Sequence, residues 1–333
     1  MGKVSNRLNY YKRIFNAYIF KKNSSNLSFW HTPLKVNKLT DADRQTLRAY
    51  PQNFEDKIGQ IHTTDDCGVI MLDYRGNLGL QYNPNAIAQL ALGLYDKVIS
   101  GKDCSKEFLT QAAYFLDHGR LVKDGVLLWE YKFPFEMRNQ LTSPWRSALA
   151  QGQGISVCLR AYKLSNDDRY LDAAIKAFKS FSYLANEHPG GVLDDSDGYT
   201  WLEEYIVSPP NHVLNGFIWA LYGVRDYAVV MNDKYAWSLW DDCVKTLSEN
   251  LCNYDLGFWT TYDFISDRSK NHPVMPVSEY YQRLHVIQMD GCYQLTGLDK
   301  FKEYRDTWNG YLDNYFYRKV AYVWKIYFKL RYF

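Results

Sequence analysis

The sequence lacks any pair of cysteines at a spacing that binds metal or marks a redox site. Its six cysteines are scattered without a C-x-x-C motif, so we predict free thiols, a reducing compartment and no bound metal. No apolar run reaches the ~18 to 20 residues that a membrane-spanning helix needs. The apolar stretch Ile14–Phe20 contains Asn16 and has no cleavage site after it, unlike a signal peptide. These absences favour a cytoplasmic protein.

Acidic residues are missing from both ends of the chain. Residues 1–22 carry six basic side chains and residues 318–333 carry five, with no acid in either segment. The formal net charge of the whole chain is +2, so subtracting these eleven bases leaves −9 for the body, which disfavours binding of nucleic acid. The basic, aromatic ends are candidates for contact with the inner face of a membrane or with a partner glycosyltransferase. A homodimer is a further candidate assembly.

Aromatic residues, in contrast, are abundant. The chain has 29 tyrosines and 10 tryptophans, and its aromatic content is 17%. Flat rings cover the apolar faces of sugars while a phenol or indole N–H finds a polar partner, so this excess favours carbohydrate recognition. The alternative is that most of the rings pack in an aromatic helical core.

Apolar residues recur at helical spacing from residue 86 onward. Ile87, Leu90, Ala91 and Leu94, for example, follow the i, i+3, i+4, i+7 pattern of an amphipathic helix. The pattern predicts helices in pairs with short links: 86–100 with 105–118, 147–164 with 168–185, 212–230 with 233–251, and 279–296 with 299–316. Regular repetition of such pairs predicts a mainly α fold, an incomplete (α/α) toroid of about four helical hairpins. An ordinary helical bundle is the alternative.

Four segments follow from this pattern. Residues 1–59 are interpreted as an irregular basic extension and residues 60–85 as a small N-terminal β element with a turn at Arg75–Asn77. Residues 86–317 form the predicted toroid, which is long enough to bury a sizeable core. Residues 318–333 are interpreted as a basic aromatic tail.

Polar and aromatic residues gather where the first helix of each pair begins. The four clusters contain Tyr82, then Trp145, Arg146 and Gln153, then Glu203, Glu204, Tyr205 and Asn211, then Tyr281, Arg283 and His285. If the first helices form the inner ring, all four clusters lie at one end of it, which predicts a single cleft. We expect Asn211 to cap a helix that begins near His212.

The segment Trp201–Tyr205 places two carboxylates between aromatic residues. Rings that exclude water from a carboxylate raise its pKa, which suits the exchange of protons. The alternative is a pair of solvated loop acids beside core aromatics. The nearby run Asp194–Gly198 contains a D-x-D-G fragment of a calcium loop but lacks the glutamate of an EF-hand, so we expect a turn there.

Five stretches carry a more specific pattern: QYNPNAIAQLALGLYD (81–96), SPWRSALAQGQGISVCLRAY (143–162), WLEEYIVSPPNHVLNGF (201–217), FWTTYDF (258–264) and YYQRLHVIQM (280–289). In order and spacing they resemble the glucuronyl C5-epimerases, which convert D-glucuronate to L-iduronate within heparosan or heparan-type chains. The first sixty residues have no equivalent in this resemblance. The large β-rich insertion of the animal enzymes is missing or much reduced, which favours the bacterial type.

The resemblance implies roles for four residues. Glu204 resembles the family's catalytic carboxylate and Tyr205 the tyrosine beside it. Tyr281 resembles the catalytic tyrosine on the opposite side of the sugar, and Tyr262 a further active-site tyrosine. Three residues after Tyr262, Ile265 stands where the resemblance implies a substrate-binding arginine.

Other residues are expected to complete the site. The candidates to replace the missing arginine are Arg146, Arg268 and Arg283. The further candidates for substrate contacts are Tyr82, Trp145, Gln153, Trp201, Asn215 and His285. Trp145 suits stacking on a sugar ring, and the amides suit hydrogen bonds to hydroxyls, although packing inside the fold is an equal alternative for the amides.

Epimerisation at C5 needs a base on each face of the carbon and donors for the developing enediolate. We expect Glu204 to be one base and Tyr281 the other, with Arg283 or His285 as the cation that favours the phenolate. This chemistry needs no cofactor. The expected substrate and partner is an anionic polysaccharide, unsulfated heparosan.

Three other functions remain open. A polysaccharide lyase begins with the same abstraction of the C5 proton and then expels the C4 substituent. A glycoside hydrolase would use two carboxylates, from the set Glu203, Glu204, Asp194 and Asp195. A non-catalytic polysaccharide-binding subunit of a capsule-synthesis complex would use the aromatic residues alone.

Overall fold

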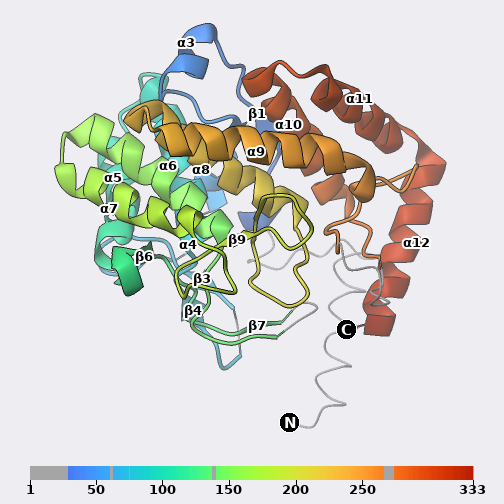
Figure 1. The fold of residues 1–333 in the computed structure, drawn as a ribbon, viewed down its shortest axis with the longest axis horizontal. Coiled ribbons are helices and arrows are strands. Elements are labelled where there is room, and N and C mark those ends of the chain that lie inside the picture. The colour runs from blue at the N-terminus through green and yellow to red at the C-terminus, as the bar shows by residue number, and fades with distance from the viewer. Residues whose placement is uncertain (1–28, 61–62, 75, 137–139, 266–273, 333) are drawn as a thin grey trace.

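The computed structural model describes residues 29–60, 63–74, 76–136, 140–265 and 274–332. Within these ranges the protein is mainly α-helical, and the helices follow one another in pairs (Figure 1). The four pairs are α4 (Pro84–Ile99) with α5 (Ser105–Asp117), α6 (Ala148–Ser165) with α7 (Asp168–Phe178), α8 (Leu214–Met231) with α9 (Lys234–Asn250), and α10 (Glu279–Thr296) with α11 (Asp299–Asp313). The predicted α fold of four helical hairpins is confirmed.

Local sequence explains where these helices begin and end. The Asn83 side chain accepts a hydrogen bond from the Ala86 N–H, and Pro84 occupies the first turn of α4, as expected of a helix start. Asn166 after α6 and Asn232 after α8 adopt the left-handed conformation, which ends a helix and turns the chain back. Short links of this kind keep the two helices of each pair adjacent.

The start of α8 differs from the prediction. The helix begins at Leu214 rather than near His212, and Asn211 does not cap it, because the Asn211 amide donates to Asp263 Oδ2 at 3.3 Å. His212 has a φ of 32°, outside the helical region. Its ring pairs with Glu203, and Val213 forms a β-bridge with Asp263. These contacts with neighbouring segments hold the chain out of the helix until Leu214.

The first helices of the pairs form an inner layer. Side chains of α6 and α8 are buried on nearly all sides, whereas α7 and α9 bury one stripe each. The α6 and α8 backbones approach closely because Gly152 and Gly223 face each other, and a Cβ on Gly152 would lie 2.6 Å from the Ala220 Cα. The inner helices pack in the order α4, α6, α8, α10, which is the arc of an incomplete toroid.

The N-terminal segment (residues 29–60) fills the space between α10 and α4. Strand β1 (Lys35–Val36) pairs antiparallel with β2 (Gln52–Asn53), and both strands pack on α10. The short helix α3 (Asp41–Gln45) lies between them in the chain, and the 3₁₀ turn η2 (Glu55–Gln60) packs on α4. Part of the predicted extension 1–59 is therefore packed into the helical array. Residues 1–28 lie outside the described ranges, and the predicted segment boundaries stay predictions.

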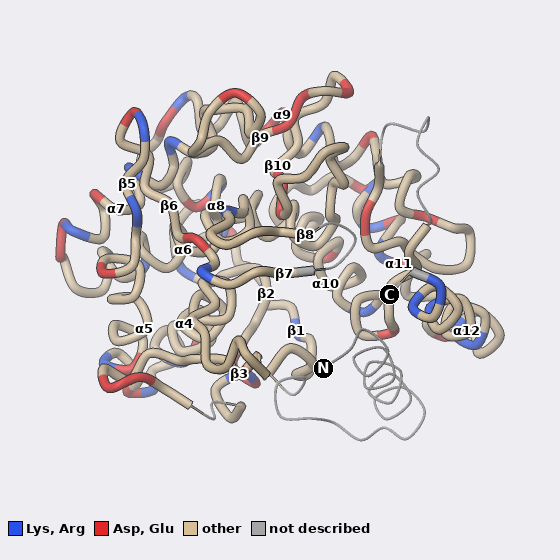
Figure 2. Tube along the Cα trace, turned by 90° about the horizontal axis from the view of Figure 1, so that it is seen from below, with Lys and Arg blue, Asp and Glu red and all other residues tan. Residues whose placement is uncertain are grey.

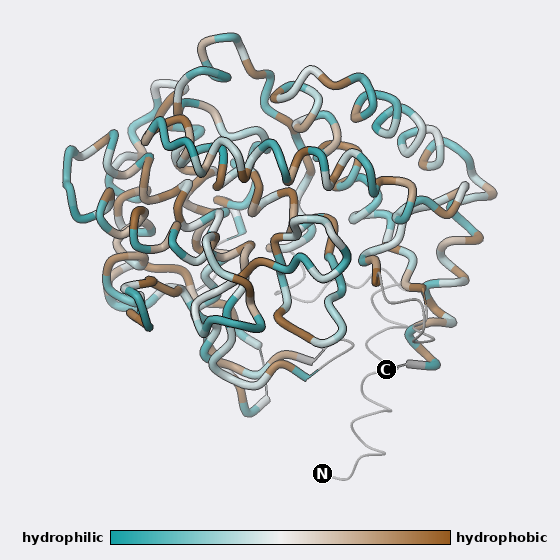
Figure 3. Tube along the Cα trace, viewed as in Figure 1, coloured by the Kyte–Doolittle hydropathy of each residue, from teal (hydrophilic) through white to brown (hydrophobic). Residues whose placement is uncertain are grey.

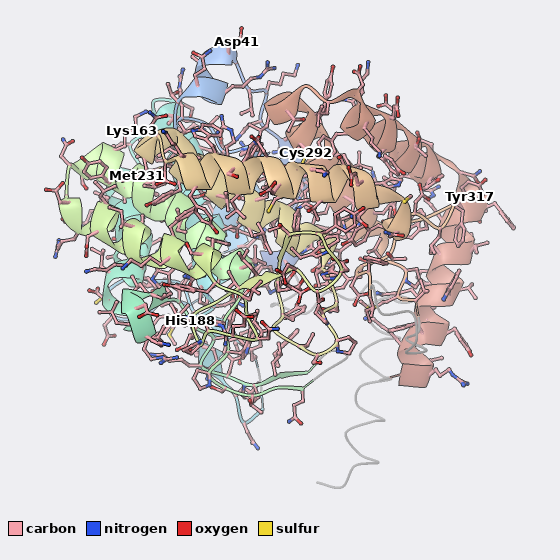
Figure 4. The ribbon with its side chains drawn as sticks, in the orientation of Figure 1. Asp41, Lys163, His188, Met231, Cys292 and Tyr317 are labelled. Atoms are coloured by element: carbon pink, nitrogen blue, oxygen red, sulfur yellow. The ribbon has the colours of Figure 1, made fainter. Side chains whose placement is uncertain are left out.

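Short antiparallel strand pairs precede the inner helices α4, α6 and α8. They are β3 (Leu72–Asp73) with β4 (Leu80–Gln81), β5 (Arg120–Leu121) with β6 (Leu127–Leu128), β7 (Phe135–Glu136) with β8 (Gln140–Leu141), and β9 (Leu193–Asp194) with β10 (Trp201–Leu202). Strands β3, β4 and β7 lie at the lower side of Figure 1. Lys163, Met231 and Cys292, near the C-terminal ends of α6, α8 and α10, lie at the upper side in Figure 4. The loops that lead into the inner helices thus share one end of the molecule.

The segment interpreted as a basic tail is helical. Helix α12 (Tyr315–Tyr332) runs down the right edge of Figure 1, shows basic positions in Figure 2 and alternates between hydrophilic and hydrophobic positions in Figure 3. Phe316 is 69% exposed and Val323 65% exposed. None of the helices in the described ranges combines the length and apolar character needed to cross a membrane.

Candidate active site

A cleft of about 260 Å³ opens where the inner helices begin. It approaches the lower end of the roughly 300–1,000 Å³ typical of small-molecule sites, which is room for about one sugar unit. The residues on its walls include Asn83, Asn85, Gln89, Trp145, Glu204, Tyr205, Asn215, Trp219, Tyr262, Tyr280 and Tyr281. They come from the beginnings of all four inner helices and from adjoining loops, so the four helix beginnings meet at this cleft, although Arg146 of the second predicted cluster lines a separate cavity.

Glu204 lies between strand β10 and helix α8 and is 93% buried, with 7% of its surface exposed. Burial, opposed by a hydrogen bond with Tyr205 and aided by the charges of Glu203 and Asp263, raises the pKa of its carboxyl to about 8. The predicted direction of the shift is therefore confirmed. Oε2 of Glu204 is buried and has no hydrogen-bond partner among the described residues.

The first turn of α8 makes room for this carboxylate. Gly216 lies directly beneath it: a Cβ at Gly216 would come within 2.7 Å of the Glu204 Cβ and 2.8 Å of its Cδ, far closer than van der Waals contact permits. A side chain at this position would displace Glu204 from the cleft. The lack of a side chain at Gly216 thus leaves the space that the Glu204 side chain occupies.

Glu203, the neighbouring acid, has different surroundings. Its Oε1 lies 2.6 Å from His212 Nδ1, and the His212 ring stacks on Trp201 at 4.2 Å. Its backbone oxygen accepts from the Ala148 N–H at the start of α6. Glu203 does not line the cleft and instead connects its loop to the start of α6 and to the segment that precedes α8. Two acids adjacent in sequence therefore have separate structural roles.

Three tyrosines face one another beside Glu204. The hydroxyls of Tyr205 and Tyr262 are 3.3 Å apart, and the rings of Tyr262 and Tyr281 meet edge to face at 5.5 Å. Burial, followed by the charge of Glu204, raises the pKa values of Tyr205 and Tyr262 well above their usual range. These two groups therefore stay protonated at neutral pH and serve as hydrogen-bond donors.

An aromatic wall stands on the side of α6. The Tyr131 and Trp145 rings stack in parallel at 3.8 Å, and their backbones exchange hydrogen bonds. The Trp145 Nε1 donates to Phe133 O at 2.9 Å, and Phe135 stacks on Tyr205 at 5.9 Å. The rings of Tyr131, Phe133, Phe135 and Trp145 form this wall, and all four line the cleft. Rigid rings of this kind suit the apolar face of a sugar.

Amide side chains supply polar contacts. Asn215, on the first turn of α8, lines the cleft and is 2% exposed, and its Oδ1 has no hydrogen-bond partner in the part of the chain that the structure describes. Asn85 and Gln89 on α4 also line the cleft and are hydrogen-bonded to each other at 3.2 Å. A buried amide oxygen without a partner costs free energy unless a ligand or water supplies a donor, so Asn215 is positioned to contact a sugar.

Sequence reasoning missed the contribution of the N-terminal segment. Trp30, Gln52, Phe54 and Lys57 line the cleft, although this segment was interpreted as an extension outside the helical domain. The tyrosines Tyr74 and Tyr131 were also missed. None of these residues belongs to a motif or to the start of a predicted helix, so no sequence signal was available to find them.

Several residues expected in the site make structural contacts instead. Arg146 donates through Nε to Gly191 O at 2.8 Å and through Nη2 to Ala185 O. Trp201 is fully buried and donates to the Asp197 carboxylate. Neither Arg146 nor Trp201 lines the cleft, because backbone carbonyls and a local carboxylate already satisfy their donors.

Gln153 and Tyr82 are likewise engaged elsewhere. Gln153 is fully buried behind Gln89, to whose amide its Oε1 is hydrogen-bonded at 3.4 Å. The Tyr82 hydroxyl donates to Asp65 Oδ2 at 2.5 Å. Both side chains therefore pack within the fold and do not reach the cleft wall.

The two expected cations near Tyr281 are not in place. Arg283 points to the surface, where it pairs with Glu279 at 2.8 Å. Burial lowers the pKa of His285 to about 3, and its Nδ1 lies 2.9 Å from Thr260 Oγ1. His285 is therefore neutral, and the expectation that it provides positive charge is wrong. Arg268 lies outside the described residues.

The predicted turn at Asp194–Gly198 is present. The Gly198 N–H donates to Asp195 O, and the Ser196 hydroxyl donates to Asp194 Oδ2 at 2.8 Å. Within the described ranges, no three His, Cys, Asp or Glu side chains are grouped so as to hold a metal ion. The six cysteines are unpaired.

Comparison with known proteins identifies the family to which this chain is similar. Residues 123–310 match the family described as D-glucuronyl C5-epimerase C-terminus. An uncharacterized protein of Methanocaldococcus jannaschii is 31% identical over 186 residues, which cover 55% of this chain and 57% of that protein. The D-glucuronyl C5-epimerase of Caenorhabditis elegans is 34% identical over 191 residues, which cover 53% of this chain and 30% of that enzyme.

The chain therefore spans just over half the length of the archaeal relative and less than a third of the nematode enzyme. Among solved structures, a family 76 glycoside hydrolase (mannosidase) from Bacteroides thetaiotaomicron aligns with a TM-score of 0.41 and 14% identity, covering 68% of this chain and 60% of that one. The family match extends over more than half of the chain and includes Glu204, Tyr205, Tyr262 and Tyr281. This protein belongs to the D-glucuronyl C5-epimerase C-terminus family.

Proposed function

We propose that the protein is a D-glucuronyl C5-epimerase that converts D-glucuronate units to L-iduronate within a heparosan-like polysaccharide. The observation that carries this proposal is the grouping of Glu204 with Tyr205, Tyr262 and Tyr281 in one cleft of sugar size. Glu204 has a pKa of about 8, close to neutral pH, as suits a group that both takes and gives protons.

In the proposed reaction, the Glu204 carboxylate removes the C5 proton, and the electron pair of the broken C–H bond moves into the substrate carboxylate as an enediolate. The hydroxyls of Tyr205 and Tyr262 donate hydrogen bonds to the enediolate oxygens, where negative charge develops. Tyr281 returns a proton to C5 from the opposite face and becomes a phenolate. Proton exchange with solvent then restores the Glu204 carboxylate and the Tyr281 phenol.

Hydrolysis of a glycosidic bond is a less well supported function for the same cleft. Hydrolysis of a glycosidic bond uses two carboxyl groups on either side of that bond. Among the described residues that line the cleft, Glu204 is the only acid, and Glu203 is turned away toward His212. This arrangement supports proton transfer at carbon over hydrolysis.

The test is nuclear magnetic resonance of heparosan incubated with the protein in deuterated water. Wild type should place deuterium at C5 and yield L-iduronate signals, whereas Glu204→Gln and Tyr281→Phe should each lose at least roughly 10²-fold in rate. Glu303→Gln on the exposed face of α11 and Tyr293→Phe further along α10 are matched controls and should retain activity. Signals of an unsaturated uronate would identify a lyase instead, and absence of both products would refute catalysis on this substrate.

We also propose that α12 contacts an anionic membrane surface. This helix holds five basic residues and no acid, and it exposes Phe316, Val323 and Tyr327, a combination that suits an interfacial helix. The variant with Phe316, Val323 and Tyr327 all changed to serine should sediment less with vesicles of anionic lipid than wild type does. Equal sedimentation of the two proteins would contradict this assignment.

A further inference from the structure

A second cavity adjoins the candidate active site. It has a volume of about 470 Å³ and is lined by residues 140–142 and 144–146, from strand β8 and its link to α6, and by residues 206–208, which follow Tyr205. Trp145 lines both this second cavity and the cleft that holds Glu204. The larger of the two cavities thus lies outside the site described above and shares a wall with it.

The boundary between the two cavities is thin. Tyr205 lines the cleft and the next residue, Ile206, lines the second cavity, and consecutive Cα atoms are only about 3.8 Å apart. The rings of Trp145 and Tyr205 have centroids 5.9 Å apart. Leu141 and Tyr205 belong to one buried cluster, on which Trp145 and Val207 pack. The two cavities therefore meet at the Trp145 and Tyr205 rings.

The lining of the second cavity is largely polar. Gln140, Thr142 and Ser208 are exposed and carry an amide and two hydroxyls, groups that both donate and accept hydrogen bonds. Among the described residues that line this cavity, Arg146 is basic and none is acidic. The lining therefore suits a ligand that is rich in oxygen and carries no positive charge.

Backbone carbonyls hold the Arg146 side chain in this wall. Its Nε donates to Gly191 O at 2.8 Å, and its Nη2 donates to Ala185 O at 2.9 Å and His188 O at 3.4 Å. A guanidinium has five N–H donors, and Nη1 of Arg146 makes no hydrogen bond with the described residues. The protein thus fixes the cation and leaves donors for a ligand.

We propose that the second cavity binds the sugar that neighbours the reacting uronate in the same polysaccharide chain. This inference rests on the proposed function, because it assigns the path of the polymer beyond that cleft. The cleft has room for about one sugar unit, so a neighbouring sugar lies outside it, and Trp145 borders both positions. In heparosan this neighbour is an N-acetylated amino sugar, whose hydroxyl and amide groups match those of the wall.

The experiment fills the second cavity from two exposed positions, with Thr142→Trp and with Ser208→Trp. The matched control is Thr46→Trp: Thr46 is also exposed and directly follows α3, which lies at the upper side of Figure 1, away from β7. The substrates are heparosan and the methyl glycoside of glucuronate, which is a single sugar. All three variants should unfold at the same temperature as wild type, because none of these positions is buried.

We expect each cavity-filling variant to lower kcat/KM for C5 exchange on heparosan about tenfold more than on the methyl glycoside, mainly through KM. A tenfold change corresponds to the loss of one or two hydrogen bonds. Thr46→Trp should match wild type on both substrates. An equal loss on the two substrates would overturn the proposal, because it would mean that the tryptophans disturb the cleft itself. Unchanged rates on heparosan in both variants would overturn it as well.

Binding separates failure of this inference from failure of the proposed function. Titration calorimetry on Glu204→Gln needs no turnover: heparosan should bind more tightly than the methyl glycoside, and adding Thr142→Trp should remove most of that difference. If wild type exchanges no C5 hydrogen but this difference is found and then removed, the epimerase function is refuted and the subsite is supported. Equal affinity for heparosan with and without Thr142→Trp would rule out the subsite.

Discussion

Replacing Glu204 by glutamine should remove catalysis and at the same time stabilise the fold. The carboxyl has an ordinary pKa of 4.5 when exposed to water and a pKa of about 8 in the folded protein. The folded state therefore holds its proton while the unfolded state loses it, so this group lowers stability as the pH rises from about 4.5 to 8. Glutamine keeps the shape of the side chain and does not ionise.

The magnitude follows from the same two values. For each pH unit between these two pKa values, the unfolding free energy falls by about 1.4 kcal/mol. At pH 7 the ionisable side chain thus costs on the order of 3 kcal/mol relative to one that cannot ionise. Near pH 4.5 the cost is close to zero. The same burial that lowers the unfolding free energy raises the pKa of the Glu204 carboxyl to a value at which it exchanges protons near neutral pH.

The assay is urea unfolding followed by tryptophan fluorescence at pH 5, 6, 7 and 8. The unfolding free energy of Glu204→Gln should exceed that of wild type by an amount that grows with pH. The exposed control Glu303→Gln should follow wild type at every pH. Parallel curves for Glu204→Gln and wild type would refute the reasoning, because they would mean that Glu204 ionises as readily in the folded protein as in the unfolded chain.

Three further predictions concern rate, positioning and stability. The kcat/KM for C5 exchange should rise as the pH increases toward about 8, because the raised pKa of Glu204 limits its base form; a flat profile from pH 6 to 8 would contradict this. Gly216→Ala should lower C5 exchange more than tenfold by displacing Glu204, whereas Gly310→Ala, which has open space around it, should not. Arg160→Met should destabilise the fold by about 3–5 kcal/mol in urea unfolding, because it removes the Arg160 partner at 2.6 Å from the buried Asp226 and leaves only Arg225 at 3.7 Å.

The sequence alone was sufficient for the helical architecture. Apolar residues at helical spacing, such as Ile87 to Leu94, predicted each inner helix. The bounds of the paired helices agree within three residues, except that α7 ends at Phe178, where the prediction extended to residue 185. This works because a helix face is encoded by residues three and four apart, within one segment. The convergence of the helix starts on one cleft followed from repetition of the same unit.

The tertiary structure decided which polar residues face the cleft. Glu203 and Glu204 are indistinguishable by local pattern, but His212 holds one and Gly216 makes room for the other. Trp201 was expected to desolvate the acid and instead stacks on His212.

Local sequence patterns were equally unable to predict which residues of the site carry charge. Burial makes His285 neutral, and Lys57 enters the cleft wall from a segment with no recognisable motif. Whether a polar side chain is buried, paired or left open depends on residues that lie far from it in the sequence. Helical periodicity is a property of neighbours along the chain, whereas burial and pairing exist only once distant segments pack together.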